Sequence, residues 1–73
     1  MNYTFKQLRK RENLTCEEIA AALHISESAY RKYEISARIP QLKTLVALKQ
    51  LYKCTDEELM GAVKYHTSKR KNG

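Results

Sequence analysis

Residues 15–34 read TCEEIAAALHISESAYRKYE and contain the starts of two short helices with a turn between them. The Thr15 hydroxyl can accept a hydrogen bond from the amide of Glu18, whose carboxylate can reach back to the amide of Thr15. Ser26 is a favourable cap for the second helix, because its side-chain oxygen can accept from a free amide in the first turn. The stretch therefore predicts two helices joined by a short turn, in a unit of about residues 16–35.

The spacing within this unit suits two helices that pack at a steep angle. Ala20 is small and lies at the fifth position, where the two helices approach each other. His24 lies in the turn, at the ninth position, and must tolerate a left-handed backbone. The inner positions are apolar or amphipathic, namely Ile19, Leu23, Ile25, Tyr30 and Tyr33. This pattern is that of a helix-turn-helix, whose second helix enters the major groove of DNA.

The rest of the chain also reads as helix, because it has only two glycines, one proline and no stretch of alternating apolar and polar residues. A first helix is expected from Thr4 to about Glu12, and a fourth after Pro40 in the sequence QLKTLVALKQLY. The expected apolar face of that helix consists of Leu42, Leu45, Val46, Leu48, Leu51 and Tyr52. A fifth helix is capped at Thr55 in the sequence TDEE. The fold class is therefore all-α, with five helices.

Basic residues outnumber acidic ones by fourteen to eight, which gives a net charge of +6. They gather in residues 6–11, in residues 31–53 and in the last ten residues. Such a surplus favours a polyanionic partner, either nucleic acid or an anionic membrane surface, although solvated surface charges would also account for it. We expect one domain over residues 1–66 and a basic, flexible tail over residues 67–73.

Several other classes of function find little support in the sequence. No run of about 18 apolar residues is present, and the N-terminal sequence lacks the apolar segment of a signal peptide, so we expect a cytoplasmic protein without a membrane span. The side chains of Cys16, Cys54, His24 and His66 do not follow the spacings of zinc sites, so neither a metal nor a cofactor is expected. No nucleophile–histidine spacing or glycine-rich phosphate loop indicates an enzyme.

The segment LTCEEIAAALHISESAYRKYE, residues 14–34, resembles the Cro/CI-type (XRE family, lambda-repressor-like) helix-turn-helix regulators. The likeness continues through Pro40-x-Leu42-x-x-Leu45 and through TDEEL, and it covers about residues 4–62. It implies a five-helix lambda-repressor-like DNA-binding domain in a bacterial or phage protein, which binds palindromic operator DNA as a dimer. The chain departs from the family pattern at Cys16, where glutamine is common, and at His24 and Ser36, where glycine is common.

The outer face of the second helix of this motif is expected to read DNA. Tyr30 and Tyr33 define its inner face and are expected in the core, with their hydroxyls at the rim. The residues expected to read bases are Glu27, Ser28 and Lys32, with Arg31 contacting a phosphate or a neighbouring base. Glu27 could instead only stabilise the helix N-terminus, and Lys32 could be solvated or contact only phosphate.

Contacts to the DNA backbone are expected from Arg38, Lys43 and Arg9, with Lys10 and Arg11 as further candidates. Cys16 and Ser26, at the starts of the two helices of the motif, are assigned to the backbone as well, the former through the helix N-terminus. The Cys16 thiol could also have a lowered pKa at this helix end and respond to oxidation. Acidic residues follow it at once, which argues against that second role.

The fifth helix is expected to form the dimer interface, through Leu59, Met60, Val63 and Tyr65. Packing of these side chains on Phe5 is the alternative. The leading hypothesis for function is a sequence-specific transcriptional regulator, a repressor or Cro-like switch protein, controlled by concentration, dimerisation or a partner protein. The second hypothesis is an antitoxin or anti-repressor, a protein-interaction module on the same fold.

Overall fold

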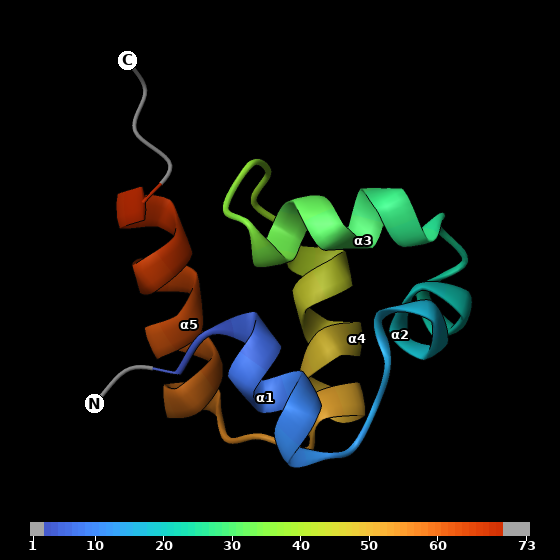
Figure 1. Cartoon of the computed structure of the whole chain (residues 1–73). Helices are drawn as coiled ribbons and strands as arrows, with labels where there is room; N and C mark the ends of the chain where they lie inside the picture. The colour runs from blue at the N-terminus through green and yellow to red at the C-terminus, as the bar shows by residue number, and fades with distance from the viewer. Residues whose placement is uncertain (1–2, 70–73) are drawn as a thin grey trace.

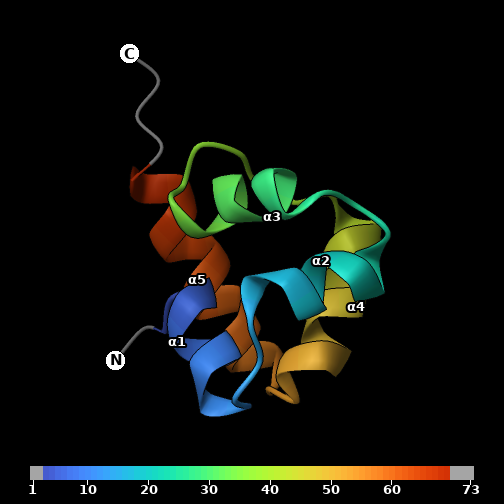
Figure 2. The same ribbon diagram turned by 45° about the vertical axis from the view of Figure 1, so that its right-hand side comes forward.

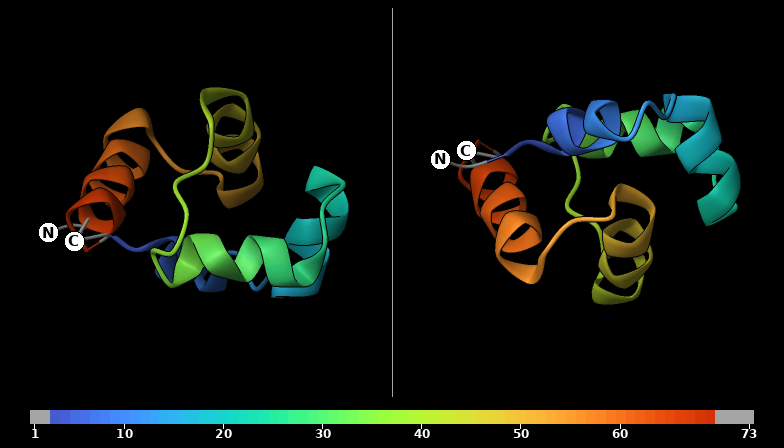
Figure 3. Two further views of the ribbon diagram at one scale, coloured as in Figure 1. Left: turned by 90° about the horizontal axis from the view of Figure 1, so that it is seen from above. Right: turned by 90° about the horizontal axis from the view of Figure 1, so that it is seen from below.

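The computed structural model describes residues 3–69 and consists there of five helices with no strand. They are α1 (Phe5–Arg11), α2 (Cys16–Leu23), α3 (Glu27–Glu34), α4 (Leu42–Tyr52) and α5 (Asp56–Lys69). The prediction of an all-α protein with five helices is confirmed. In Figure 1, α3 lies across the top of the molecule, with α1 and α2 below it and α5 at the left. The views from above and below place α4 and α5 together on one side, opposite α3 (Figure 3).

The helix starts follow the capping pattern that the sequence predicts. The Thr15 hydroxyl accepts from the Glu18 amide at 3.1 Å, and the Glu18 carboxylate accepts from the Thr15 amide at 2.8 Å. Thr55 and Glu58 form the same reciprocal pair, with both distances 3.0 Å. The Ser26 hydroxyl accepts from the amide of Ala29 at 3.0 Å. These bonds satisfy amides that have no partner within their own helix, and so they fix where each helix begins.

The turns use left-handed backbone without glycine. His24 ends α2 at φ 61°, as its place in the turn predicts, and Ser36 follows α3 at φ 65°. Asn13 and Lys53 also have positive φ. A side chain at such positions costs conformational energy that glycine would avoid, so the packing of the helices has to hold these turns in place.

The core lies where α1, α3 and α4 meet, and its largest members are aromatic. Tyr30 and Tyr52 are fully buried, and their hydroxyls share a hydrogen bond of 2.7 Å. The expectation that the Tyr30 hydroxyl lies at the rim is therefore wrong, because a buried partner on α4 satisfies it. Phe5 stacks on Tyr52 from α1, and Ile19 and Ala20 close the core from α2. In Figure 2, α2 lies in front of α4 and below α3.

The apolar face of α4 is narrower than predicted. Leu48 and Tyr52 are buried and Leu45 and Leu51 pack partly against the core, but Leu42 is 77 % exposed and Val46 is 54 % exposed. At 100° per residue, Leu42 and Val46 lie roughly 120° and 160° around the helix from Leu48. Leu42 and Val46 therefore point away from the core and are not part of the buried face of α4.

Helix α5 is longer than predicted, since it continues to Lys69. The predicted domain boundary at residue 66 falls inside this helix, and residues 67–69 are helical where a flexible tail was expected. Residues 70–73, the remainder of that tail, lie outside the described residues. His66 accounts for the continuation, because it is buried and carries hydrogen bonds to two other segments of the chain.

Candidate nucleic-acid interface

The outer side of α3 is a shallow hollow lined by four polar side chains of the helix and by the apolar side chain of the residue that follows it. Its lining residues are Glu27, Ser28, Arg31, Lys32 and Ile35. Ser28, Arg31 and Lys32 are exposed, whereas Tyr30 and Tyr33 lie on the opposite side of the helix and are buried. The predicted division of α3 into an inner aromatic face and an outer polar face is therefore confirmed. The structure brings together all four residues expected to read bases.

Two of these four residues are bound to each other. One carboxylate oxygen of Glu27, Oε2, accepts from Arg31 Nε at 3.0 Å and from Arg31 Nη2 at 2.5 Å. Both side chains remain accessible, at 42 % for Glu27 and 60 % for Arg31. Since the residues are four apart on one helix, the pair runs along the outer face of α3. The sequence analysis assigned them separate contacts, and this pairing was not predicted.

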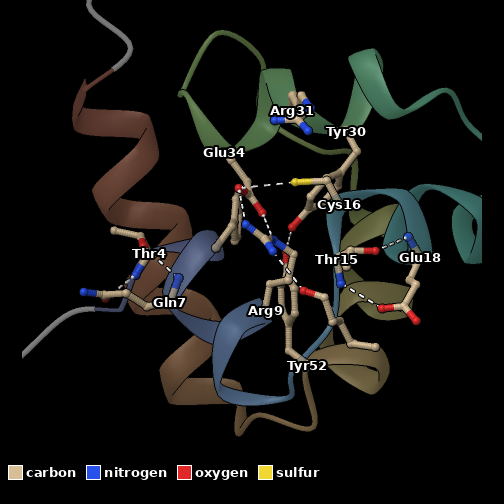
Figure 4. A network of polar contacts seen from close by, with 12 residues as sticks. Thr4, Gln7, Arg9, Thr15, Cys16, Glu18, Tyr30, Arg31, Glu34 and Tyr52 are labelled. Atoms are coloured by element: carbon tan, nitrogen blue, oxygen red, sulfur yellow. Dashed lines mark hydrogen bonds and ion pairs between the residues drawn. The ribbon is translucent and has the colours of Figure 1, made fainter.

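Arg9 has a structural role, in contrast to the expected contact with the DNA backbone. It is only 8 % exposed, and its Nε and Nη2 donate to the two oxygens of the Glu34 carboxylate at 2.6 and 3.2 Å. Its Nη1 donates to the carbonyl oxygen of Leu14 at 2.8 Å. Figure 4 shows this guanidinium between α1 and α3, with Arg31 on the outer side of α3. These three hydrogen bonds hold the guanidinium between α1 and α3, so Arg9 ties the two helices together.

Glu34 carries the negative charge of this buried network. Burial opposes ionisation of its carboxyl, but the hydrogen bonds and positive charge of Arg9 outweigh this and lower the pKa of Glu34 below its ordinary value. Glu34 therefore stays ionised and paired at neutral pH. Because it is the last residue of α3, the pair fixes the angle at which this helix lies across the domain.

The Cys16 thiol is directed toward the same network. Its Sγ lies 3.8 Å from Glu34 Oε1, and the residue is buried. Burial and the nearby negative charge of Glu34 raise the pKa of Cys16, so the hypothesis of a lowered pKa at this helix end is wrong. A phosphate contact at this position would have to come from the amides at the start of α2.

Three of the residues expected at the DNA backbone are exposed. Ser26 precedes α3, Arg38 lies in the connection after α3, and Lys43 lies in the first turn of α4. Neither Arg38 nor Lys43 forms an ion pair with another residue in the described part of the chain. Their charges are thus available to an external anion.

Two lysines of α1, Lys6 and Lys10, add positive charge beside α3. Lys6 was not among the residues expected to contact DNA. Lys6 and Lys10 are exposed and line a hollow with Cys16 and Arg31. Lys6 also lines a second hollow with Lys69 at the end of α5. The spacing of four between Lys6 and Lys10, which places both on one side of a helix, is the signal that could have identified Lys6. Arg11, in contrast, binds Glu58 with two hydrogen bonds of 2.9 and 3.1 Å.

The residues expected to form a dimer interface are split by the fold. Leu59 and Val63 pack partly against the core, Tyr65 is half-buried, and Met60 is 53 % exposed. Leu59 and Val63 are turned toward the core because Ala62 and His66, on the same side of α5, are buried there. Of the four, Met60 presents the largest exposed apolar side chain.

Residues 3–69 hold no group of three side chains that could bind a metal ion. None of the helices in that range is both long enough and apolar enough to cross a bilayer.

Comparisons with known proteins agree with the geometry of α2 and α3. A family model described as "Helix-turn-helix domain" matches residues 4–60. The HTH-type transcriptional regulator AnsR of Bacillus subtilis is 38 % identical over 58 residues, which is 80 % of this chain and 50 % of that protein. The uncharacterised HTH-type transcriptional regulator YobD of the same organism is 38 % identical over 56 residues, 77 % of this chain and 50 % of that protein.

A third relative is longer than the first two and is named as an activator. The HTH-type transcriptional activator BcrR of Enterococcus faecalis is 32 % identical over 59 residues, 81 % of this chain and 29 % of that protein. The matched region thus spans half the length of the first two relatives and less than a third of this one. No solved structure matches the chain significantly. On the match of its family model and of these relatives, the chain belongs to the helix-turn-helix family of DNA-binding transcriptional regulators.

Proposed function

We propose that this chain is a sequence-specific DNA-binding repressor that inserts α3 into the major groove of a palindromic operator. The observation that carries the proposal is the outer face of α3, where Ser28 and Lys32 lie exposed beside the Glu27–Arg31 pair. Lys32 has no ion-pair partner among residues 3–69, so its ammonium is available to guanine O6 and N7. Ser28 can donate to or accept from a neighbouring base.

The backbone of DNA is held on either side of α3 in this proposal. Arg38 and Lys43 contact phosphates on one side, and Ser26 together with the first amides of α2 contacts them at the leading end. Lys6 and Lys10 replace Arg9 as the contacts from α1. If about five phosphates are neutralised by each protomer, the logarithm of the binding constant should fall with the logarithm of salt concentration with a slope near −4 to −5.

Dimerisation is proposed through α5, with Met60 at the centre of the contact. A two-fold dimer places two copies of α3 about one helical turn of DNA apart, which is the geometry that a palindromic operator requires. Sedimentation of the wild-type protein and of Met60→Lys, with and without operator DNA, tests this part. A charge at the centre of the contact should shift the protein toward monomer.

The decisive experiment is selection of bound sequences from random DNA. Lys32→Ala should relax the preference at one position and cost about 1–3 kcal/mol on the preferred sequence, whereas Arg38→Ala should weaken all sequences alike. Lys53→Asn is the matched control, because Lys53 is an exposed lysine between α4 and α5 that lines none of the hollows around α3, and asparagine tolerates its left-handed backbone. Absence of any enriched sequence at low salt would contradict sequence-specific binding. Placing the selected sequence within a promoter then separates repression from activation.

A protein-interaction role on the same fold is the second candidate. It is favoured by the exposed apolar side chains of Leu42 and Val46, which lie one turn apart on α4. An antitoxin or anti-repressor would hold a toxin or a regulatory partner protein there, and it would copurify with that partner from its own host. Loss of the partner in Leu42→Ser/Val46→Ser, with DNA selection unchanged, would support this candidate.

A further inference from the structure

The outer face of α3 carries one acidic side chain, Glu27, in the region expected to approach DNA. A carboxylate close to phosphates is repelled by them, so an isolated acid would weaken binding to every sequence. Glu27 is not isolated, because it accepts both of its observed hydrogen bonds from Arg31. Its charge is therefore compensated on the helix surface before any DNA is present.

The geometry of the pair leaves part of the guanidinium unused. Arg31 presents its side edge, Nε and Nη2, to a single oxygen of Glu27. A guanidinium has five N–H groups in a rigid plane. The end edge of Arg31, made of Nη1 and the second N–H of Nη2, is therefore still able to donate hydrogen bonds. No other residue among 3–69 receives a hydrogen bond from this end edge. Two parallel N–H donors at this spacing match the O6 and N7 acceptors of guanine.

We propose that Glu27 and Arg31 form one recognition unit, in which Arg31 reads a guanine with its end edge while Glu27 holds the side edge in position. Glu27 is then a positioning residue for Arg31, and a G·C base pair is the ligand of the unit. This inference rests on the proposed function, and it replaces the separate assignments of Glu27 to a base and of Arg31 to a phosphate or a neighbouring base.

Two consequences separate this unit from an ordinary surface ion pair. First, the carboxylate keeps Arg31 from turning toward the nearest phosphate, so it should raise discrimination between sequences while not raising affinity for DNA in general. Second, the contributions of the two side chains should depend on each other, because Glu27 acts only through Arg31. A pair that merely stabilises α3 would instead change the affinity for all sequences by the same factor.

The test uses Glu27→Gln, Arg31→Lys and the double variant, with Lys53→Asn as control. Glutamine keeps the size of Glu27 and removes the charge, while lysine keeps the charge of Arg31 and removes the fork of donors. Sequences are selected from random DNA with each protein. Affinity is then measured for the selected site and for the same site with the guanine of interest changed to adenine. Circular dichroism and thermal unfolding of each variant establish that it is folded.

The expected result is a wild-type preference for guanine over adenine at one position of each half-site. For one bidentate contact this preference is worth about 10- to 100-fold. Arg31→Lys should reduce it strongly, because a lysine can still donate to guanine O6 or N7 but cannot present two parallel N–H groups in a fixed plane. Glu27→Gln should reduce it by about tenfold without weakening binding to unselected DNA, and the double variant should resemble Arg31→Lys.

Four results would overturn the inference. The guanine preference could survive Glu27→Gln unchanged, it could survive Arg31→Lys unchanged, or the two single effects could multiply in the double variant. A uniform loss of affinity in Glu27→Gln would also assign the pair to helix stability alone. If the wild-type protein selects a sequence and one of these results follows, only the inference fails. If the wild-type protein selects no sequence, the proposed function itself fails.

Discussion

His66 on α5 accepts a hydrogen bond at Nε2 from the backbone N–H of Phe5, the first residue of α1, at a distance of 3.1 Å. An amide N–H can only donate, so Nε2 carries no proton. The other ring nitrogen, Nδ1, lies 2.7 Å from Ser36 Oγ and must hold the proton of the neutral ring. One buried imidazole thus links the start of α1, the turn after α3 and the last part of α5.

Stability should therefore fall in mild acid through His66. Burial lowers the pKa of His66 below its ordinary value, against a smaller opposing influence of the Glu34 charge. The unfolded chain then binds the proton more readily than the folded one. The contribution of neutral His66 to the free energy of unfolding is therefore fully present above the unfolded pKa of about 6.5, and it is lost as the pH falls toward the lower pKa of the folded state. The free energy of unfolding from urea titrations should decrease by up to about 1.4 kcal/mol per pH unit in that window.

The control for this prediction separates the two histidines of the chain. His66→Gln can still accept from the Phe5 amide but does not titrate, so its stability should vary less between pH 7 and pH 5 than that of the wild type. His24→Asn keeps a residue that tolerates the left-handed turn and should retain the wild-type decrease. An equal pH dependence in His66→Gln and in the wild type would refute the assignment.

The buried pair of Arg9 and Glu34 should be far more sensitive to single than to double substitution. Arg9→Ala leaves the Glu34 carboxylate buried without a partner, and this should cost about 3–5 kcal/mol of unfolding free energy. Arg9→Met/Glu34→Leu removes both charges and should recover most of that loss. Urea unfolding of the single variants and of the double variant measures the coupling. A double variant as unstable as the sum of the singles would show that the two side chains act independently.

The Cys16 thiol should react slowly. Burial and the Glu34 charge raise its pKa, so little thiolate is present at neutral pH. In a Cys54→Ala background, labelling of Cys16 by a disulfide reagent at pH 7 should be slower than labelling of a model thiol. Mild oxidants should therefore have the same small effect on DNA binding by Cys16→Ser as on DNA binding by the wild-type protein. Labelling faster than the model thiol would restore the redox hypothesis.

The sequence predicted the fold well because most of its signals are local. Capping pairs such as Thr15 with Glu18 join residues three apart, and the left-handed turn at His24 follows from the residue itself and from the helix before it. The outer and inner faces of α3 follow from helical periodicity alone. These local features also determine which side chains face outward in the candidate site.

The sequence could not predict contacts between distant segments. In the sequence, Arg9 is one of several basic residues in a charged run and nothing distinguishes it from its neighbour Lys10. It is buried against Glu34 only because α3 packs beside α1 in the folded domain. The exposure of Leu42 depends in the same way on how α4 is rotated against the core. The pairing of Glu27 with Arg31 could have been predicted, because residues four apart on a helix are neighbours. Each of the two was instead assigned its own contact with DNA, because each can bind a base or a phosphate.

The hydroxyls of Tyr30 and Tyr52 should behave as a coupled pair. Both are buried, and they share one hydrogen bond of 2.7 Å between α3 and α4. Tyr30→Phe alone leaves the buried Tyr52 hydroxyl without its partner and should cost about 1–3 kcal/mol. Tyr52→Phe should cost less, because the Tyr30 hydroxyl is also hydrogen-bonded to the Glu34 carboxylate. Tyr30→Phe/Tyr52→Phe removes both hydroxyls while keeping both rings, so it should be clearly less destabilising than the sum of the single changes. Tyr33→Phe is the matched control, since Tyr33 contacts Tyr30 only edge-on at its ring, and it should cost little. Additive losses in the double variant would mean that the two hydroxyls contribute to stability independently of each other.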